Sequence, residues 1–148
     1  MPAQNLIYAD VEGNIGYQTP GRLPVRGAGD GWMPQPGWDS SYDWTGFIPF
    51  DELPVSYNPA SGYIVTANNA IVTDDYPYFL SRDWDYGYRA DRIAHLIERR
   101  VAAAPLTAQD MREIQMDSEM WIGKRLASAM DDVEAVSYTH LRAHETKA

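Results

Sequence analysis

The sequence has no cysteine, only three histidines and no apolar run that approaches the length of a membrane span. The lack of cysteine excludes disulfides, thiolate zinc sites and cysteine nucleophiles. A spanning helix needs about 20 consecutive apolar residues, so no membrane span is predicted. Positive charge is also scarce, because 12 lysines and arginines face 21 acids for a net charge of -9. This balance argues against a nucleic-acid partner, since phosphate binding needs a basic face.

Apolar and aromatic side chains are abundant instead. Hydrophobic residues make up 45% of the 148-residue chain, which includes five tryptophans and ten tyrosines. Such a composition is too apolar for a disordered chain, and the length fits one domain or a piece of a larger one. The first residues, Met1 to Asn5, lack the basic and apolar regions of a signal peptide.

The first half of the chain has the pattern of strands and loops. Asn5–Asp10 and Ile15–Tyr17 flank the turn Glu12–Asn14 and predict a hairpin. Residues 19–46 are rich in glycine and proline, and their three tryptophans favour a loop that packs. Two further short strands are predicted from apolar and β-branched runs, at Phe47–Phe50 and Tyr63–Ala67.

The second half changes to a helical period. Residues 86–101 carry an apolar stripe, and Thr107 with Asp110 predicts a capping box at the start of a second helix. The stripe of that second helix is predicted to continue through Met111, Ile114, Ser118, Trp121, Ile122 and Leu126. Strands followed by a helical pair predict an α+β fold.

The end of the chain departs from this pattern. Residues 136–148 resemble a translated sequencing adapter, and the helical pattern before them stops without a terminator. We therefore predict a domain over residues 1–135 and a non-native tail over 136–148 that makes no specific contacts. His140 and His144 are four residues apart, which suits two metal ligands on a helix. They lie in this tail without a third ligand, so no metal site is predicted.

The side chains able to support catalysis are few. His95 lies between apolar helix positions and is interpreted as a packed or surface residue. The spacing of four acids in the preceding loop matches no EF-hand calcium loop, and they are interpreted as solvated; they are Asp74, Asp75, Asp83 and Asp85. Asn68 and Asn69 follow the predicted strand Tyr63–Ala67, where a side-chain amide can serve as an oxyanion donor. On spacing alone, such a pair is more often a turn.

An ordered series of short motifs resembles the β chain of the penicillin acylase family. The motifs are Gln4-Asn5, Tyr8–Asp10, Gly13–Tyr17, Gly21–Arg26, Trp44–Pro49, Asn58-Pro59, Ser61–Ile64, Thr66–Asn69, Asp75–Pro77 and Tyr88–Ile93. Each motif is weak by itself. Their order and spacing over roughly residues 3 to 100 are specific for the family, although not for a substrate.

The resemblance implies a piece of the αββα sandwich of N-terminal-nucleophile hydrolases. In that family a precursor cleaves itself into α and β chains, and the new N-terminal serine attacks an acyl amide with its own amine as base. Asn68 matches the oxyanion asparagine. Arg92, in Ala90–Ile93, best matches the active-site arginine, with Arg89 as the competing candidate. The matching serine is absent from this sequence, so the chain alone is expected to be inactive.

The resemblance also implies partners and a location. The expected substrate is a small acyl amide, such as a β-lactam side chain or an acyl-homoserine lactone, and the expected protein partner is the α chain. No catalytic cofactor is implied, although many members hold a structural calcium, and Asp83 lies near one such position. The implied location is periplasmic or secreted. The alternatives are a carbohydrate-binding module, suggested by the acidic aromatic loops, and an inactive family scaffold.

Overall fold

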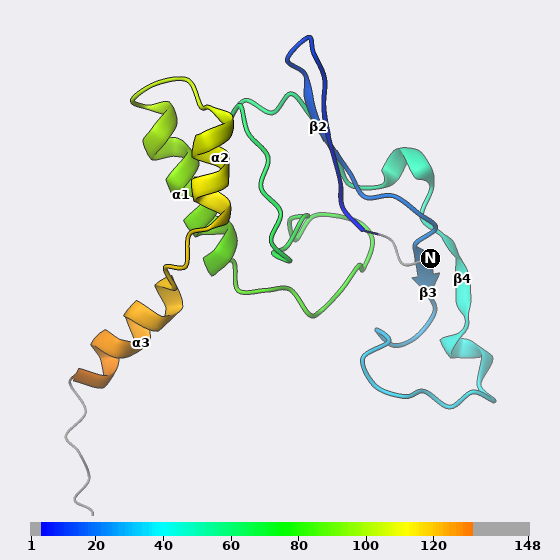
Figure 1. Cartoon of the computed structure of the whole chain (residues 1–148). Coiled ribbons are helices and arrows are strands. Elements are labelled where there is room, and N and C mark those ends of the chain that lie inside the picture. The colour runs from blue at the N-terminus through cyan, green and yellow to red at the C-terminus, as the bar shows by residue number, and fades with distance from the viewer. Residues whose placement is uncertain (1–3, 132–148) are drawn as a thin grey trace, which may run out of the picture.

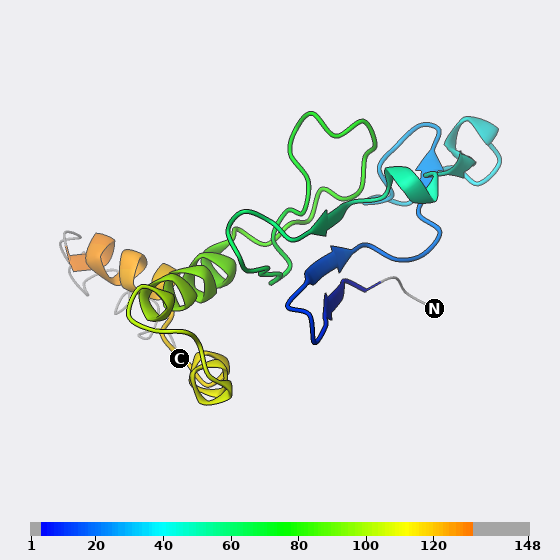
Figure 2. The ribbon, with the colours of Figure 1, turned by 90° about the horizontal axis from the view of Figure 1, so that it is seen from above.

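The computed structural model of the chain describes residues 4–131, with strands first and helices after (Figure 1). The sheets and the helices occupy opposite ends of an elongated molecule (Figure 2). The elements are β1 (Leu6–Ala9), β2 (Ile15–Gln18), β3 (Pro24–Arg26), η1 (Ser40–Tyr42), β4 (Trp44–Phe47), η2 (Phe50–Glu52), β5 (Val55–Tyr57), α1 (Tyr88–Val101), α2 (Ala108–Gln115) and α3 (Trp121–Asp131). The predicted α+β class is confirmed.

The hairpin predicted at the start of the chain is confirmed. β1 and β2 pair antiparallel, and β5 adds to the other edge of β2. The Asp10 carboxylate organises the turn by accepting N–H bonds from Glu12 at 2.9 Å and Asn14 at 2.8 Å. Asn58 then joins the end of β5 to the hairpin, because its side chain accepts from Ile15 N and donates to Asn14 Oδ1.

The interpretation of residues 19–46 as an irregular, packed loop is wrong in two respects. β3 lies within this range and pairs antiparallel with β4, with a bulge between Val25 and Arg26. The tryptophans of the range are exposed by 61% at Trp32, 91% at Trp38 and 58% at Trp44. Side chains of this size carry most of their stabilising effect through burial, so these three contribute little to packing within the described residues.

The predicted strand Tyr63–Ala67 is also wrong. The segment forms no ladder, and the only nearby bridge joins Asn69 to Asp85. It lies against α1 instead, where Tyr63 and Val65 pack on the helical core and the Tyr63 hydroxyl donates to Glu98 at 2.5 Å. A β-branched run needs a neighbouring strand to pair with, and none lies beside this run in the described part of the chain.

The helical end agrees with the prediction from the sequence as far as Gln115. α1 begins after Gly87, whose φ of 86° favours glycine. At Thr107 the predicted capping box is present, since its side chain accepts from Asp110 N while the Asp110 carboxylate accepts from Thr107 N at 2.8 Å. Leu96, Ile97 and Ile114 form the core between α1 and α2.

The single second helix predicted from Met111 to Leu126 is divided in two. α2 ends at Gln115, and α3 begins at Trp121. Asp117 lies in the break, where its carboxylate accepts from Glu119 N at 3.3 Å and from the Arg92 guanidinium. A side chain that binds the backbone two residues on competes with helical hydrogen bonds, which accounts for the break.

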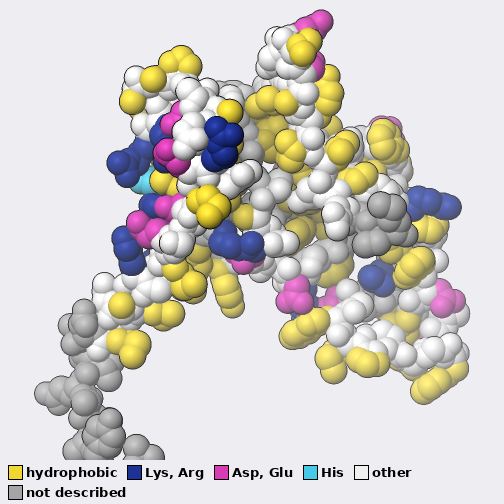
Figure 3. Space-filling view, viewed as in Figure 1, with side chains coloured by type: hydrophobic (Ala, Val, Ile, Leu, Met, Phe, Trp, Pro, Cys, Tyr) yellow, Lys and Arg dark blue, Asp and Glu magenta, His cyan; other side chains and the backbone are white. Residues whose placement is uncertain are grey.

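The buried core is small for the length of the chain. Within the described part of the chain, two groups of apolar side chains are buried, one in the sheet end (Tyr17, Ile48, Leu53) and one in the helical end (Leu96, Ile97, Ile114). Many large apolar side chains are exposed instead, among them Phe50 at 73%, Val55 at 63% and Tyr57 at 62%. Apolar side chains are spread over the visible face of the sheet end (Figure 3).

Two further expectations concern membrane spans and the tail of the chain. No helix within residues 4–131 is long and apolar enough to cross a membrane. The predicted tail, 136–148, and the predicted domain end at residue 135 lie outside the described residues.

The capping box provides a test of the helical end. Thr107→Ala removes the acceptor for Asp110 N and should lower the free energy of unfolding of the 148-residue chain by about 1 kcal/mol. Thr107→Ser keeps the hydroxyl and should lower it much less. Urea unfolding followed by circular dichroism measures both variants. Equal losses for alanine and serine would show that the threonine methyl group, and not the cap, is responsible.

Candidate functional site around Asn68

Asn68 lies where the loop after Tyr63 passes the segment that leads into α1. Its carbonyl oxygen accepts from Asp85 N at 2.8 Å, and Asn69 forms a parallel bridge with Asp85. The backbone of Asn68 is left-handed, with a φ of 64°. Asparagine tolerates this conformation better than most residues with a side chain, so the sequence suits the turn.

The Asn68 side chain is held by Arg89. An N–H of Arg89 Nη2 donates to Asn68 Oδ1 at 2.6 Å. A guanidinium has donors only, so the atom that faces it must be the amide oxygen. The amide nitrogen of Asn68 consequently faces away from Arg89, and within residues 4–131 it has no hydrogen-bond partner. An exposed N–H₂ group of fixed orientation is thus available to an acceptor from outside.

The neighbouring asparagine is used differently. Asn69 Oδ1 accepts from Ala67 N at 3.0 Å, and Asn69 Nδ2 donates to the carbonyl of Ala70, also at 3.0 Å. Both polar ends of this side chain are therefore engaged with the local backbone. Of the two asparagines, Asn68 is the one whose donors are available.

Arg92 makes a separate ionic cluster. Its guanidinium donates to both carboxylate oxygens of Asp117, at 2.9 and 2.8 Å, and lies 3.2 Å from the Glu119 carboxylate. Its carbon Cζ lies 5.6 Å from the centre of the Trp121 ring, within the range of a cation–π contact. The Arg92 side chain is only 14% exposed. These contacts join α1 to the start of α3, on a different segment from Asn68.

The charges of this cluster stabilise one another. The hydrogen bond from Arg92 holds the pKa of Asp117 below its ordinary value of 3.8, while Asp117 raises the pKa of Arg92. The pKa of Glu119 is also lowered, mainly by its hydrogen bond from Lys124 and then by Trp121 and Arg92. All three groups are therefore charged at neutral pH.

The two arginines share a groove between the helices. The groove has a volume of about 520 Å³ and an apolar floor, to which Ile93, Met111, Ile114, Trp121 and Ile122 contribute. Arg89 and Arg92 both line it. The assignment of Arg92 as the active-site arginine stays a prediction, while the structure brings Arg89, the competing candidate, to Asn68.

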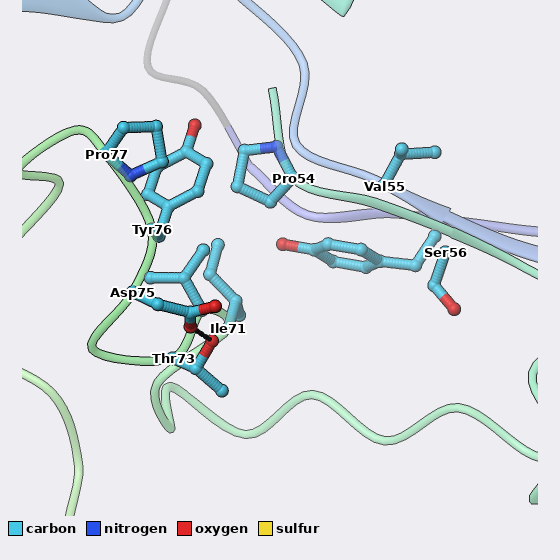
Figure 4. Close-up of a pocket in the computed structure, with 10 residues that line it drawn as sticks. Pro54, Val55, Ser56, Ile71, Thr73, Asp75, Tyr76 and Pro77 are labelled. Carbon is cyan, nitrogen blue, oxygen red and sulfur yellow. Dashed lines mark hydrogen bonds between the residues drawn. The ribbon is translucent and has the colours of Figure 1, made fainter. Parts of the chain in front are cut away.

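A second hollow lies between the sheet end and the loop after Asn69 (Figure 4). It has a volume of about 370 Å³, and Pro54, Val55, Ile71 and Tyr76 are among the residues that line it. Asp75, its one acidic group, accepts a hydrogen bond from Thr73, which lowers the Asp75 pKa. The Tyr76 hydroxyl donates to the Glu52 carbonyl at 2.8 Å and so joins this loop to the segment just before β5.

Metal ligands do not gather in the described part of the chain. No group of three or more histidine, cysteine, aspartate or glutamate side chains within residues 4–131 is placed to hold a metal ion. Asp83, which the resemblance places near a calcium position, therefore has no set of acidic partners there. His95 packs edge-on to the Trp121 ring, 5.2 Å between centroids. His140 and His144 lie outside the described residues.

Sequence reasoning does not single out Asp85 and Asp117, two well-connected acids of this region. Asp85 is predicted to be a solvated loop acid, yet it contacts Asn68, Gly87 and Arg89. The Asp-x-Gly spacing ahead of a helix start was a usable signal, because an aspartate there can accept from the backbone N–H two residues on. The contact of Asp117 with Arg92 has no such local signal, since the two residues lie 25 positions apart.

The ionic cluster predicts a pH dependence. A carboxylate with a lowered pKa in the folded state stabilises that state above its ordinary pKa and loses this effect as pH falls through the lowered value. The thermal stability of the helical end should therefore fall as pH decreases below about 4. Circular dichroism between about pH 5 and pH 3 measures the loss. In Asp117→Asn the part of this stability loss that Asp117 causes should disappear, so stability should fall less steeply with pH than in the wild type. A pH profile identical to that of the wild type would contradict the prediction.

The contact between Arg89 and Asn68 can be tested in the 148-residue chain itself. In Arg89→Gln the side-chain amide resonances of Asn68 should shift and exchange faster with solvent, because the long guanidinium no longer reaches Oδ1. Arg92→Gln is the matched control and should leave them in place. Heteronuclear NMR measures both variants. A shift of the Asn68 side-chain amide resonances in Arg92→Gln but not in Arg89→Gln would favour Arg92, the arginine that the family resemblance selects.

Comparison with known families agrees with the motif series. The sequence profile of the penicillin amidase family matches residues 1–147. The penicillin acylase 2 proenzyme of Pseudomonas sp. (strain SE83) is 41% identical over 114 residues, which cover 77% of this chain and 14% of that protein. The acyl-homoserine lactone acylase QuiP of Pseudomonas aeruginosa is 37% identical over 128 residues, covering 86% of this chain and 15% of that protein.

The fold agrees as well. A solved thermostable penicillin G acylase from Alcaligenes faecalis superposes on 90% of this chain with a TM-score of 0.62 and 31% sequence identity, and the chain covers 24% of it. The chain thus spans about a seventh of the length of the curated relatives and about a quarter of the solved chain. The Asn68–Arg89 contact lies within the matched range, and the chain belongs to the penicillin amidase family.

Proposed function

We propose that this chain is a segment of the β subunit of an amidohydrolase that cleaves an acyl group from an amine. The observation that carries the proposal is the Asn68 amide, whose oxygen is held by Arg89 and whose nitrogen is left to donate. The large exposed surface and the small core support a segment that the rest of a longer chain covers. The named activities of the acylase relatives support the reaction class.

In the proposed reaction, a serine at the new N-terminus of the β chain attacks the carbonyl carbon of the acyl amide. Its own α-amine takes the hydroxyl proton, and the carbonyl oxygen becomes an oxyanion in a tetrahedral intermediate. The amine leaves with a proton as the acyl-serine ester forms, and water then releases the acid by the same route. The serine is contributed by a segment outside this sequence.

Asn68 acts at the step where negative charge develops. Its Nδ2–H donates to the oxyanion, and its orientation is fixed before the reaction, so no reorganisation is needed at that moment. The positive charge of Arg89 on the amide oxygen polarises the group and strengthens the N–H as a donor. A backbone N–H near the serine supplies the second donor that the family resemblance implies.

The proposed substrate is a small acyl amide of the kinds named for the relatives, a penicillin or an acyl-homoserine lactone. The proposed protein partner is the α chain of the same precursor, and the proposed location is the periplasm or the outside of the cell. The rival functions make different predictions. An inactive scaffold would bind acyl amides without cleaving them, and a carbohydrate-binding module would use exposed aromatics such as Trp38 on glycans.

Substitution of Asn68 in the full-length precursor tests the proposal. Alanine is a poor choice, because the φ of 64° strains it. Asn68→Gly accepts this backbone and removes the donor, and Asn68→Asp keeps the oxygen that faces Arg89 but replaces the N–H₂ group. Both variants should lower kcat by about 10²- to 10³-fold. Turnover of a phenylacetyl or fatty-acyl anilide by the matured enzyme measures the effect.

Asn69→Ala is the control for this experiment. It should disturb only the local bonds to Ala67 and Ala70 and should lower kcat much less. Wild-type turnover in both Asn68 variants would overturn the proposal. Inactivity of Asn69→Ala together with full activity of the Asn68 variants would move the oxyanion donor by one residue.

A further inference from the structure

Asp85 makes three hydrogen bonds, one each with Asn68, Gly87 and Arg89. Its backbone N–H donates to the Asn68 carbonyl at 2.8 Å. One carboxylate oxygen, Oδ1, accepts from Gly87 N at 3.1 Å, and the other, Oδ2, lies 3.2 Å from Arg89 Nη2. The same Nη2 donates to Asn68 Oδ1 at 2.6 Å. One nitrogen carries two hydrogens, so it can serve both acceptors at once.

These contacts close a ring of hydrogen bonds. The ring runs from the Asn68 backbone to the Asp85 backbone, through the Asp85 carboxylate to Arg89, and back to the Asn68 side chain. Burial alone does not hold the Arg89 and Asn68 side chains, because Arg89 is 59% exposed and Asn68 is an exposed loop residue. The carboxylate in turn accepts from the N–H of Gly87, the residue that precedes α1.

We propose that Asp85 is a positioning residue that sets the direction of the Asn68 amide donor through Arg89. This inference rests on the proposed function and names a residue that acts without touching the substrate. Asp85 orders the guanidinium, the guanidinium orders the amide oxygen, and the amide nitrogen is left aimed at the reacting carbonyl. A donor that is misaligned by a fraction of an ångström loses much of its effect on an oxyanion.

The substitution Asp85→Asn separates positioning from folding. The amide oxygen of the new asparagine can still accept from Gly87 N, and the backbone N–H still reaches Asn68. The new N–H₂ group, however, would face the N–H groups of Arg89, donor against donor, and release the guanidinium. Asp85→Glu keeps the charge on a longer side chain and should restore part of the activity.

The experiment is a double-mutant cycle in the matured full-length enzyme, with a phenylacetyl or decanoyl anilide as the probe. Asp85→Asn should lower kcat by up to about 100-fold, with KM little changed. Added to Asn68→Gly, it should lower kcat no further, because a residue that acts only through Asn68 has nothing left to position. Asp74→Asn is the matched control, since Asp74 is an exposed acid of the same loop without a hydrogen bond or ion pair among the described residues.

The outcomes separate the inference from the proposed function. Wild-type turnover in Asn68→Gly would overturn the proposed function. A slow Asn68→Gly with a normal Asp85→Asn, or losses that multiply in the double variant, would overturn the positioning role alone. If Asp85→Asn does not mature, Arg89→Met breaks the same ring from the other side. Added to Asn68→Gly, Arg89→Met should also lower kcat no further. Losses in kcat that multiply in that double variant would again overturn the positioning role.

Discussion

The ring of hydrogen bonds through Asn68, Asp85 and Arg89 is the constraint on which the candidate site depends. It joins two stretches of irregular backbone to the first turn of α1 and leaves one amide N–H₂ group pointing outward. A donor for an oxyanion must be oriented before the charge develops, because reorganisation during the reaction would raise the barrier. A loop asparagine can meet this requirement only if its neighbours hold it.

α1 is the common support for these neighbours. Arg89 reaches the Asn68 loop, Arg92 binds the segment that begins α3, and Glu98 accepts from Tyr63. The three residues lie at successive intervals of three and six along one helix, so a single rigid element locates three separate segments. The groove between the helices is a consequence of the same arrangement, with both arginines along its wall.

Local signals in the sequence predicted local structure well. The hairpin around Asp10 and the capping box of Thr107 depend on residues within four positions of one another, and both are confirmed. Features that depend on distant partners were not predictable in this way. The run from Tyr63 to Ala67 has strand composition but lies on a helix, and the ionic contact of Asp117 is with Arg92, 25 residues earlier. Motif order identified the family, yet motif spacing could not show which arginine contacts Asn68.

The proposed function depends on one atom, Asn68 Nδ2, as a donor to the reacting oxygen. The most direct test is a crystal structure of the full-length enzyme with a tetrahedral acyl phosphonate on its nucleophile. We predict that Asn68 Nδ2 lies about 2.7 to 3.1 Å from the phosphonate oxygen that replaces the oxyanion, with Arg89 still donating to Asn68 Oδ1. A phosphonate oxygen bound only by other groups, with Asn68 Nδ2 beyond hydrogen-bonding distance, would contradict it.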